Sequence, residues 1–159
     1  MYYIINGLKI NIKSDVLSDL KKYYYSSWKY ETGGILLGKF NKENKVIEIA
    51  EVYELKSNLF SRILYRRNAK KAQKIINKRW RQTAGVINYV GEWHTHPGMQ
   101  AIPSTTDLNS LSEISLKVKD SLPGTLLLIV GEAEKINLVV QCGNAIKMQL
   151  ITEDESEEE

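Results

Sequence analysis

The sequence has almost no cysteine, since Cys142 is the only one among 159 residues. A lone cysteine excludes an intramolecular disulfide, a Cys-x-x-Cys redox pair and a cysteine-rich zinc site of the finger type. We interpret Cys142 as a structural residue. Because nothing in this cysteine usage calls for an oxidising compartment, a cytoplasmic location is expected.

Long apolar runs are absent as well. A run such as Leu126–Val130 is far shorter than the ~20 apolar residues that span a bilayer, and Met1–Gly7 lacks the basic and apolar regions of a signal peptide. With 43% hydrophobic and 26% charged residues, the composition is that of a globular protein without a membrane partner. A chain of this length fits one domain, which needs neither a disulfide nor a structural metal to fold.

Acidic residues are scarce outside the C-terminus. The formal net charge is +3, from 22 basic and 19 acidic residues, but residues 153–159 hold six of the acids. Residues 1–152 therefore carry 22 basic and 13 acidic residues, a charge of +9. We interpret 1–152 as the folded domain and 153–159 as an acidic, disordered tail. The body charge favours an acidic partner or surface and says nothing about chemistry.

Hydrophobic periodicity predicts strands mixed with about three helices. Asn6-Gly7 between two apolar runs is a strong hairpin signal. We expect helices at 14–29, 66–82 and 104–118, strands at 2–5, 8–12, 33–38, 46–53, 86–93, 125–130, 136–140 and 145–151, and a loop at 55–64. This pattern predicts a layered α/β or α+β domain in which helices pack on a mixed sheet.

Both histidines of the chain lie in one short stretch, Gly91–Pro97. At the end of a strand, side chains alternate between faces, so His94 and His96 point the same way and can hold one metal ion together. Seven residues separate His96 from Ser104, and a loop of this kind can return Asp107 to the histidines as a third ligand. Ser104 lies one helical turn before Asp107, where its hydroxyl could donate to an oxyanion beside the metal.

Two imidazoles and one carboxylate suit zinc, and three protein ligands leave the fourth tetrahedral position open for water. Bound zinc lowers the pKa of water toward ~7, which supplies a nucleophile near neutral pH. Hydrolysis also needs a general base that carries the proton to the leaving group, and acidic residues would supply it.

A family resemblance follows from these residues taken together. Glu31-Thr-Gly-Gly-Ile-Leu-Leu-Gly38, then His94-Thr-His96-Pro97, then Ser104-Thr-Thr-Asp107 resembles the JAMM motif of the JAB/MPN metalloproteases. The resemblance implies a single JAB/MPN domain with a layer arrangement similar to that of cytidine deaminases. It also implies one catalytic Zn²⁺ held by His94, His96 and Asp107, with Glu31 as general acid/base and Ser104 stabilising the tetrahedral intermediate.

The wording Gly91-Glu-Trp-His-Thr-His-Pro-Gly98 looks most like bacterial JAB proteins that accompany ubiquitin-like conjugation machinery, including those in antiphage signalling operons. Such a resemblance implies a peptidase or isopeptidase that acts at the C-terminus of a ubiquitin-like or conjugated protein. One departure is Glu92, where many eukaryotic members have an apolar residue. Glu92 shares parity with the histidines, so it could line the same pocket or orient a ligand, and the assignment of the general base to Glu31 rests on the resemblance more than on spacing.

Other interpretations remain open at this point. A His-x-His pair can be structural, and Ser104–Asp107 also satisfies a helix capping box that needs no metal. A RadC-like, nucleic-acid-associated module has a similar pattern, and a peptidase that processes sulfur-carrier proteins would share the chemistry. The deaminase signature, His-x-Glu with Pro-Cys-x-x-Cys, is absent.

The expected helix at 66–82 carries eight basic and no acidic residues. Its simplest interpretation is a solvated face opposite an apolar stripe. The functional alternatives are docking of an acidic partner, of a nucleic acid backbone, or of the chain's own tail at 153–159, which would make the tail autoinhibitory.

Overall fold

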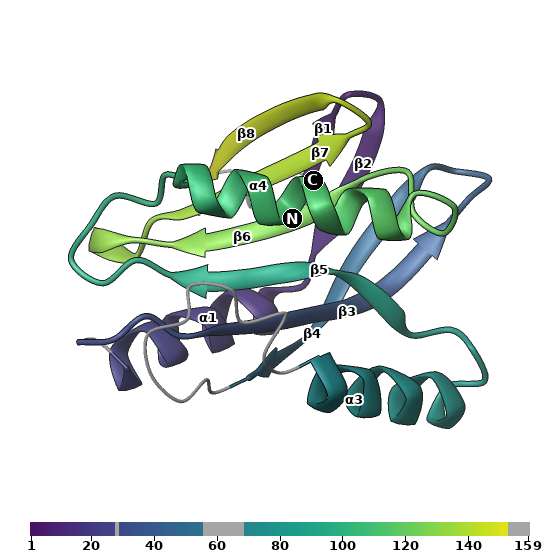
Figure 1. Cartoon of the computed structure of the whole chain (residues 1–159), viewed down its shortest axis with the longest axis horizontal. Coiled ribbons are helices and arrows are strands. Elements are labelled where there is room, and N and C mark those ends of the chain that lie inside the picture. Colours follow the sequence, from purple (N-terminus) through teal and green to yellow (C-terminus); the bar gives the residue numbers. More distant parts are fainter. Residues whose placement is uncertain (28, 56–68, 153–159) are drawn as a thin grey trace.

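The computed structural model describes residues 1–27, 29–55 and 69–152 (Figure 1). Its elements are β1 (Tyr2–Ile5), β2 (Leu8–Ile12), α1 (Ser14–Ser26), β3 (Gly33–Asn41), β4 (Val46–Glu54), α3 (Ala69–Gln82), β5 (Asn88–Thr95), α4 (Thr105–Val118), β6 (Thr125–Val130), the short 3₁₀ turn η1 (Glu132–Glu134), β7 (Ile136–Cys142) and β8 (Ala145–Ile151). The loop expected at 55–64 lies, after Leu55, outside the described residues, as does the acidic tail.

All eight strands form one mixed sheet in the order β1-β2-β4-β3-β5-β6-β7-β8. The β2–β4 and β5–β6 pairs are parallel, and every other pair is antiparallel. The predicted hairpin at Asn6-Gly7 is confirmed, because both residues take the positive φ, 54° and 77°, that a tight two-residue turn between β1 and β2 requires. The fold class predicted from the sequence, α/β with a mixed sheet, is likewise confirmed.

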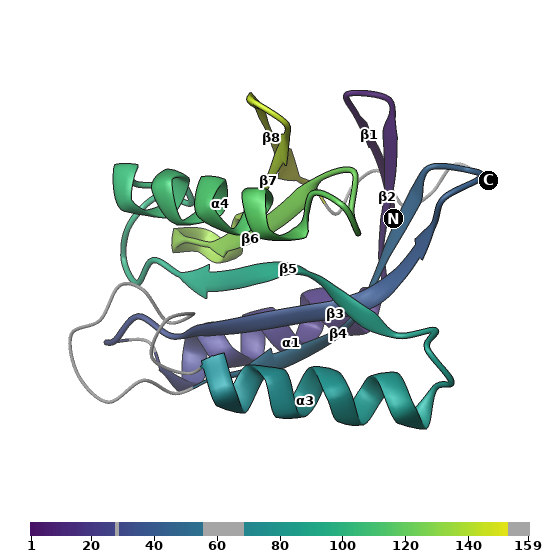
Figure 2. The same cartoon turned by 45° about the vertical axis from the view of Figure 1, so that its right-hand side comes forward.

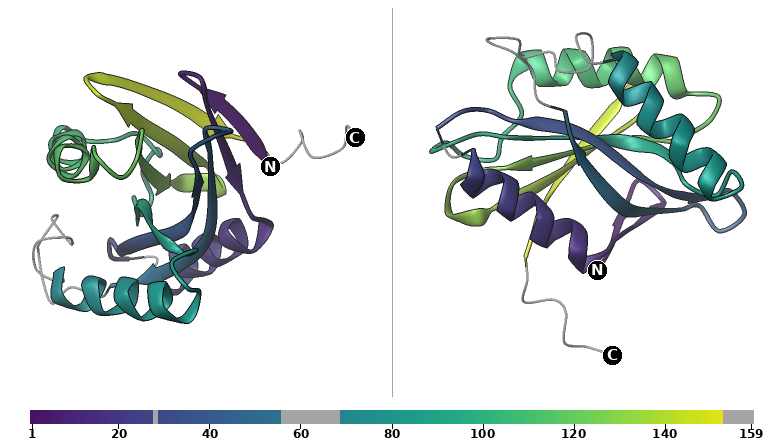
Figure 3. Two further views of the ribbon diagram at one scale, coloured as in Figure 1. Left: turned by 90° about the vertical axis from the view of Figure 1, so that its right-hand side faces the viewer. Right: turned by 90° about the horizontal axis from the view of Figure 1, so that it is seen from below.

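The helices cover opposite faces of this sheet. Figure 3 shows α3 and α4 on one side and α1 on the other, and Figure 2 separates α3 from α4. Side chains alternate accordingly along β3: Leu36 packs into the large core under α1, whereas Ile35 and Leu37 pack with α3. A third core joins α4 to the sheet through Leu111 and Leu127. The alternation of β3 thus explains why a continuous apolar run is buried on both faces.

Several predicted boundaries differ from the structure, among them the end of β3, which extends to Asn41 rather than residue 38. The first helix ends at Ser26 rather than near residue 29, because Ser27 leaves the helical conformation while its N–H still bonds to Tyr23. The strand expected at 86–93 is displaced to Asn88–Thr95. Its start is delayed by a turn in which Ala84 and Gly85 take positive φ, 52° and 82°. Within the described residues, no helix is both long and apolar enough to cross a membrane.

The Gly33-Gly34 pair allows close packing at the start of β3. A Cβ on Gly34 would collide with the carbonyl oxygen of Tyr53 on β4, so only glycine fits in this register. The same close approach brings Gly33 opposite His94 of β5. The beginning of β3, directly after Glu31, is therefore set beside the end of β5, where the histidines lie.

Candidate metal centre

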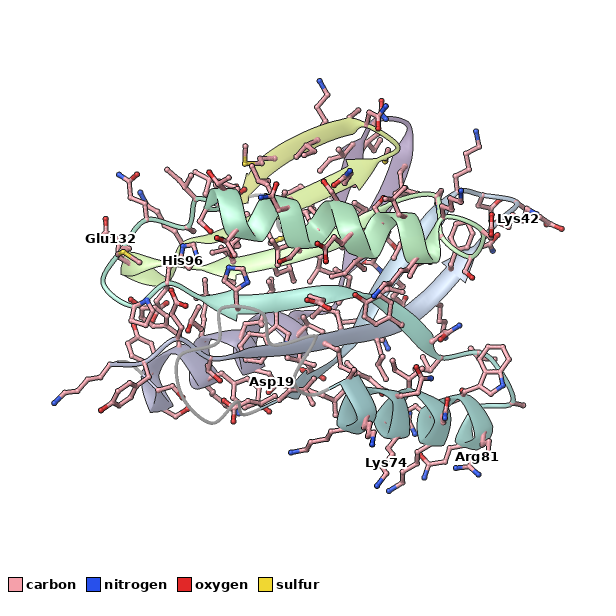
Figure 4. All side chains as sticks on the ribbon, in the orientation of Figure 1. Asp19, Lys42, Lys74, Arg81, His96 and Glu132 are labelled. Atoms are coloured by element: carbon pink, nitrogen blue, oxygen red, sulfur yellow. The ribbon has the colours of Figure 1, made fainter. Side chains whose placement is uncertain are left out.

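The end of β5 presents both histidines to one side of the sheet. His94 is the residue opposite Gly33 of β3 and Ile129 of β6, so it sits between two buried strands. His96 follows the end of β5, where its N–H donates to the Val130 carbonyl over 2.8 Å. Figure 4 shows the labelled His96 between the end of β5 and α4. The strand thus places His94 and His96 on the same face, as predicted from the alternation of side chains.

The N-terminus of α4 brings Asp107 to the histidines. Ser104 is the N-cap, and a reciprocal capping box forms: the Asp107 N–H donates to the Ser104 hydroxyl over 3.1 Å, and the Ser104 N–H donates to Asp107 Oδ2 over 2.8 Å. The capping interpretation and the metal-ligand interpretation of these two residues are therefore compatible. The cap fixes the side chain of Asp107 at the first turn of the helix.

His94, His96 and Asp107 converge at one point. The His94 Nε2 and His96 Nε2 atoms lie 3.1 Å apart, and each is 3.3 Å from Asp107 Oδ2. For a tetrahedral zinc site with bonds of 2.0–2.1 Å, the edges between ligand atoms measure about 3.3 Å. Three donors of the kinds that zinc prefers thus form a nearly equilateral triangle of the right size, and we identify them as a candidate metal centre.

A backbone carbonyl orients His96. Its Nδ1 lies 3.2 Å from the carbonyl oxygen of Gln100, and a nitrogen that faces a carbonyl must carry the hydrogen. The lone pair of His96 is then on Nε2, which points into the triangle. Metal-binding histidines are generally supported in this way. Gln100 has no signature in the sequence, because its contribution comes from the backbone of the loop.

The triangle is also an electrostatic unit. When protonated, His96 would donate a hydrogen bond to Asp107 through Nε2, and this raises the pKa of His96 above its ordinary value, although burial opposes the shift. Burial would raise the pKa of Asp107, but hydrogen bonds that His94 and His96 donate when protonated outweigh burial and hold that pKa well below its usual range. Asp107 is therefore ionised at neutral pH, in the state that a metal ligand requires.

The structure places Glu31 near the triangle without contact. Glu31 is exposed and immediately precedes β3, and its charge is one of those that raise the pKa of His96. Within the described parts of the chain, its carboxylate makes no hydrogen bond or ion pair with His94, His96 or Asp107. The strand pairing of Gly33 with His94 keeps Glu31 at this end of the sheet.

Ser104 is exposed at the mouth of the site. Its hydroxyl oxygen accepts the capping hydrogen bond from the Asp107 N–H, which leaves the hydroxyl hydrogen available as a donor. The cap and the predicted stabilising role use different parts of the same hydroxyl group. The geometry thus accommodates both.

Glu92 lies on the same face of β5 as the histidines but outside the triangle. It stands opposite Ile35 of β3 and Leu127 of β6, between the core under α3 and the core under α4. Desolvation raises the pKa of Glu92 to about 7, and a hydrogen bond from the Tyr89 hydroxyl, 3.2 Å long, opposes the shift. The prediction that Glu92 shares a strand face with the histidines is confirmed. Its side chain lies on the sheet surface between α3 and α4.

The chain is similar to known proteins over most of its length. Residues 14–141 match the family described as prokaryotic homologues of the JAB domain. The CD-NTase/cGAS isopeptidase of Pseudomonas aeruginosa is 38% identical over 101 residues, covering 64% of this chain and 63% of that protein. The protein of the same name from Vibrio cholerae is 31% identical over 105 residues, covering 65% and 64%.

The chain thus spans less than two thirds of the length of these relatives. The solution structure of a Desulfitobacterium hafniense protein covers 88% of this chain and 89% of its own, with a TM-score of 0.61 at 17% identity, and it supports the fold alone. The family match covers the candidate metal centre and the strand that precedes it. This chain belongs to the prokaryotic homologues of the JAB domain.

Proposed function

We propose that the protein is a zinc-dependent isopeptidase of the JAMM type. The observation that carries this proposal is the triangle of His94 Nε2, His96 Nε2 and Asp107 Oδ2, with edges of 3.1 to 3.3 Å. Its size and its chemistry both suit zinc. Relatives named as isopeptidases support the same reaction class.

The residues around the triangle have distinct roles in this proposal. Zinc held by the three ligands would act as a Lewis acid toward the scissile carbonyl and would acidify a water molecule. Glu31 would accept a proton from a water molecule and return it to the departing amine. Ser104 donates its hydroxyl hydrogen to the oxygen on which negative charge develops. The Gln100 carbonyl keeps His96 in the tautomer that the ligand set needs.

The substrate that we propose is a protein joined through its extended C-terminus to an amine of a second protein. The relatives carry the name CD-NTase/cGAS isopeptidase, which supports a substrate joined by an isopeptide bond. We propose that the chain acts in a ubiquitin-like conjugation system of the antiphage type, in the cytoplasm. The single domain, 1–152, would hold the complete ligand set.

Cleavage assays on purified protein test the proposal. The substrates are C-terminal fusions and lysine conjugates of ubiquitin-like proteins, with a sulfur-carrier protein fusion as a separate arm. We expect cleavage that a chelator abolishes and that zinc restores. Glu31→Gln should lower kcat at least ~100-fold with zinc still bound at one per chain. Glu43→Gln, in the exposed turn after β3, is the matched control.

Three results would count against the proposal. Cleavage that survives zinc removal would exclude the metal role. Full activity in Glu31→Gln would exclude Glu31 as the acid/base. Cleavage confined to the sulfur-carrier fusion would keep the chemistry and replace the substrate class.

A further inference from the structure

Thr95 stands between the two histidines but points to the opposite face of the sheet. Its side chain is completely buried, at 0% exposure, although it is polar. The proposed mechanism makes no use of it. A buried hydroxyl needs hydrogen-bond partners, and its partner in the structure is the backbone of Thr32, the residue that follows Glu31.

Thr95 and Thr32 are joined by both backbone and side chain. The Thr95 N–H donates to the Thr32 carbonyl over 2.8 Å, as in an ordinary antiparallel pair. The reciprocal bond is different: the Thr32 N–H donates to the Thr95 hydroxyl oxygen over 3.0 Å. The same hydroxyl lies 3.4 Å from the Thr32 carbonyl as a donor. A side chain therefore occupies the place that a backbone carbonyl takes in a regular ladder.

The hydrogen bond from the Thr32 N–H to the Thr95 hydroxyl extends the pairing of β3 and β5 by one residue. The last aligned pair of β3 and β5 is Gly33 with His94, whereas β5 stays paired with β6 one residue further, through Thr95 and Val130. Without the Thr95 hydroxyl, the N–H of the buried Thr32 would lose its acceptor. Thr95 thus holds the chain just where Glu31 leaves the sheet.

The side chain of Thr32 adds a second anchor. Its hydroxyl donates to Glu54 Oε2, at the end of β4, over 2.8 Å. Thr32 is therefore tied to strands on both sides of β3, whereas the adjoining Glu31 is exposed and contacts none of the three ligands. The backbone of Thr32 is what determines where the Glu31 carboxylate starts.

We infer that Thr95 is a positioning residue for Glu31. Thr95 joins the strand that carries His94 to Thr32, the residue after Glu31. This link fixes the distance between the histidines and the backbone of Glu31. The inference rests on the proposed function, in which Glu31 moves the proton. It adds that the residue between the ligands serves the acid/base rather than the metal.

The test replaces Thr95 with valine and with serine. Thr95→Val keeps the shape and the β-branched side chain but removes the hydroxyl, whereas Thr95→Ser keeps the hydroxyl. We expect Thr95→Val to bind zinc at one per chain with KM within about threefold of the parent and kcat at least ~10-fold lower, because small misplacements of a reacting group are costly. Thr95→Ser should recover kcat to within about threefold of the parent.

Two further variants separate positioning from general damage. Thr125→Val removes another buried threonine hydroxyl, on β6, and should leave kcat unchanged. Thr32→Val removes the bond to Glu54 and should lower kcat without lowering zinc content, which gives a second reading if Thr95→Val fails to fold. In a Glu31→Gln background, Thr95→Val should cause no additional loss, because the group that it positions is gone.

The outcomes are distinguishable from failure of the proposed function. If the parent protein is inactive or Glu31→Gln is fully active, the function itself fails. If Glu31→Gln is inactive while Thr95→Val keeps the parent kcat, the inference is wrong. It is also wrong if Thr95→Val loses activity only in proportion to lost zinc, or if serine does no better than valine.

Discussion

Helices α3 and α4 cover the same face of the sheet but contribute in different ways. α4 begins with a reciprocal capping box whose carboxylate also belongs to the metal triangle, and it buries Leu111 and Ile114. In α3, Ala72 is the only fully buried residue, and the helix has six basic and no acidic side chains. One helix has a turn that packing and hydrogen bonds hold in place, and the other has a surface that solvent covers.

This difference shows where precision is required in the molecule. Metal ligands must lie within a few tenths of an ångström of their places, so Asp107 is held by Ser104 as well as by the two histidines. Charge on a solvated helix acts over a distance comparable to the Debye length, which is ~8–10 Å, and needs no such support. Substitutions at α4 should therefore be far more damaging than substitutions on α3.

Asp107→Asn should have the largest effect. Asparagine keeps the size of the side chain and an oxygen that can accept from the Ser104 N–H, but it removes the negative charge shared by His94 and His96. We expect zinc to be lost from the purified protein and cleavage to fall below detection. Metal content by elemental analysis and a cleavage assay measure both.

Glu113→Gln is the matched control for this variant, since it removes an acid from the middle of the same helix. It should retain one zinc per chain and normal activity. A zinc content that stays normal in Asp107→Asn would show that the triangle is a capping arrangement with two histidines beside it, and not a metal centre.

The two roles of Ser104 can be separated with alanine and aspartate. Ser104→Ala removes both the cap and the donor, so kcat should fall ~100-fold and stability by about 1 kcal/mol. Ser104→Asp restores an N-cap acceptor but places a negative charge where the oxyanion would form. It should recover stability and lose at least as much activity as alanine. Recovery of activity along with stability would mean that Ser104 acts only as a cap.

Glu92, on the sheet surface between α3 and α4, predicts a pH dependence of stability. Because burial raises its pKa from 4.5 to about 7, the folded protein binds more protons than the unfolded chain between those values. Stability of the zinc-free protein should therefore fall as pH rises from about 4.5 to 7 and change little from this group above that. Because of this rise in pKa, Glu92→Gln should add nothing at pH 4 and about 3 kcal/mol at pH 8.

Urea unfolding of chelated protein at several pH values measures this difference. The variant with Tyr89→Phe, which removes the hydrogen bond that favours the ionised carboxylate, should steepen the pH dependence. A constant difference between Glu92→Gln and the parent at all pH values would show that Glu92 is ionised throughout.

The convergence of His94, His96 and Asp107 was predictable from the sequence because its determinants are local. Alternation on one strand orients His94 and His96 together, and the spacing from Ser104 to Asp107 is a single helical turn. The hairpin at Asn6-Gly7 was predictable for the same reason, since two residues specify the turn. Each of these features depends on residues close together in the chain.

The supporting contacts were not predictable, because they join distant segments. Thr95 reads in the sequence as an ordinary strand residue, and its bond to the Thr32 N–H appears only when β3 is paired with β5. The carbonyl of Gln100 carries no side-chain signal at all. The sequence offers one signal for Thr95. It lies two residues after Trp93, on the same buried face of the strand, where a polar side chain needs a hydrogen-bond partner.

The smallest effect is expected on α3, where Figure 4 shows Lys74 and Arg81 pointing away from the sheet. Lys74→Glu with Arg81→Glu should change stability by less than about 0.5 kcal/mol, because exposed charges contribute little. Cleavage of a short neutral peptide should be unchanged. If the helix docks an acidic partner, KM for the full conjugate should rise at low salt and converge with the parent at high salt.

Arg79 provides the contrast within the same helix. Its guanidinium binds both oxygens of Glu51 on β4, at 2.8 and 2.6 Å, so its charge already has a partner. Arg79→Glu should lower stability without the salt-dependent change in KM. Equal loss for the peptide and the conjugate in Lys74→Glu with Arg81→Glu would instead make α3 part of the catalytic surface.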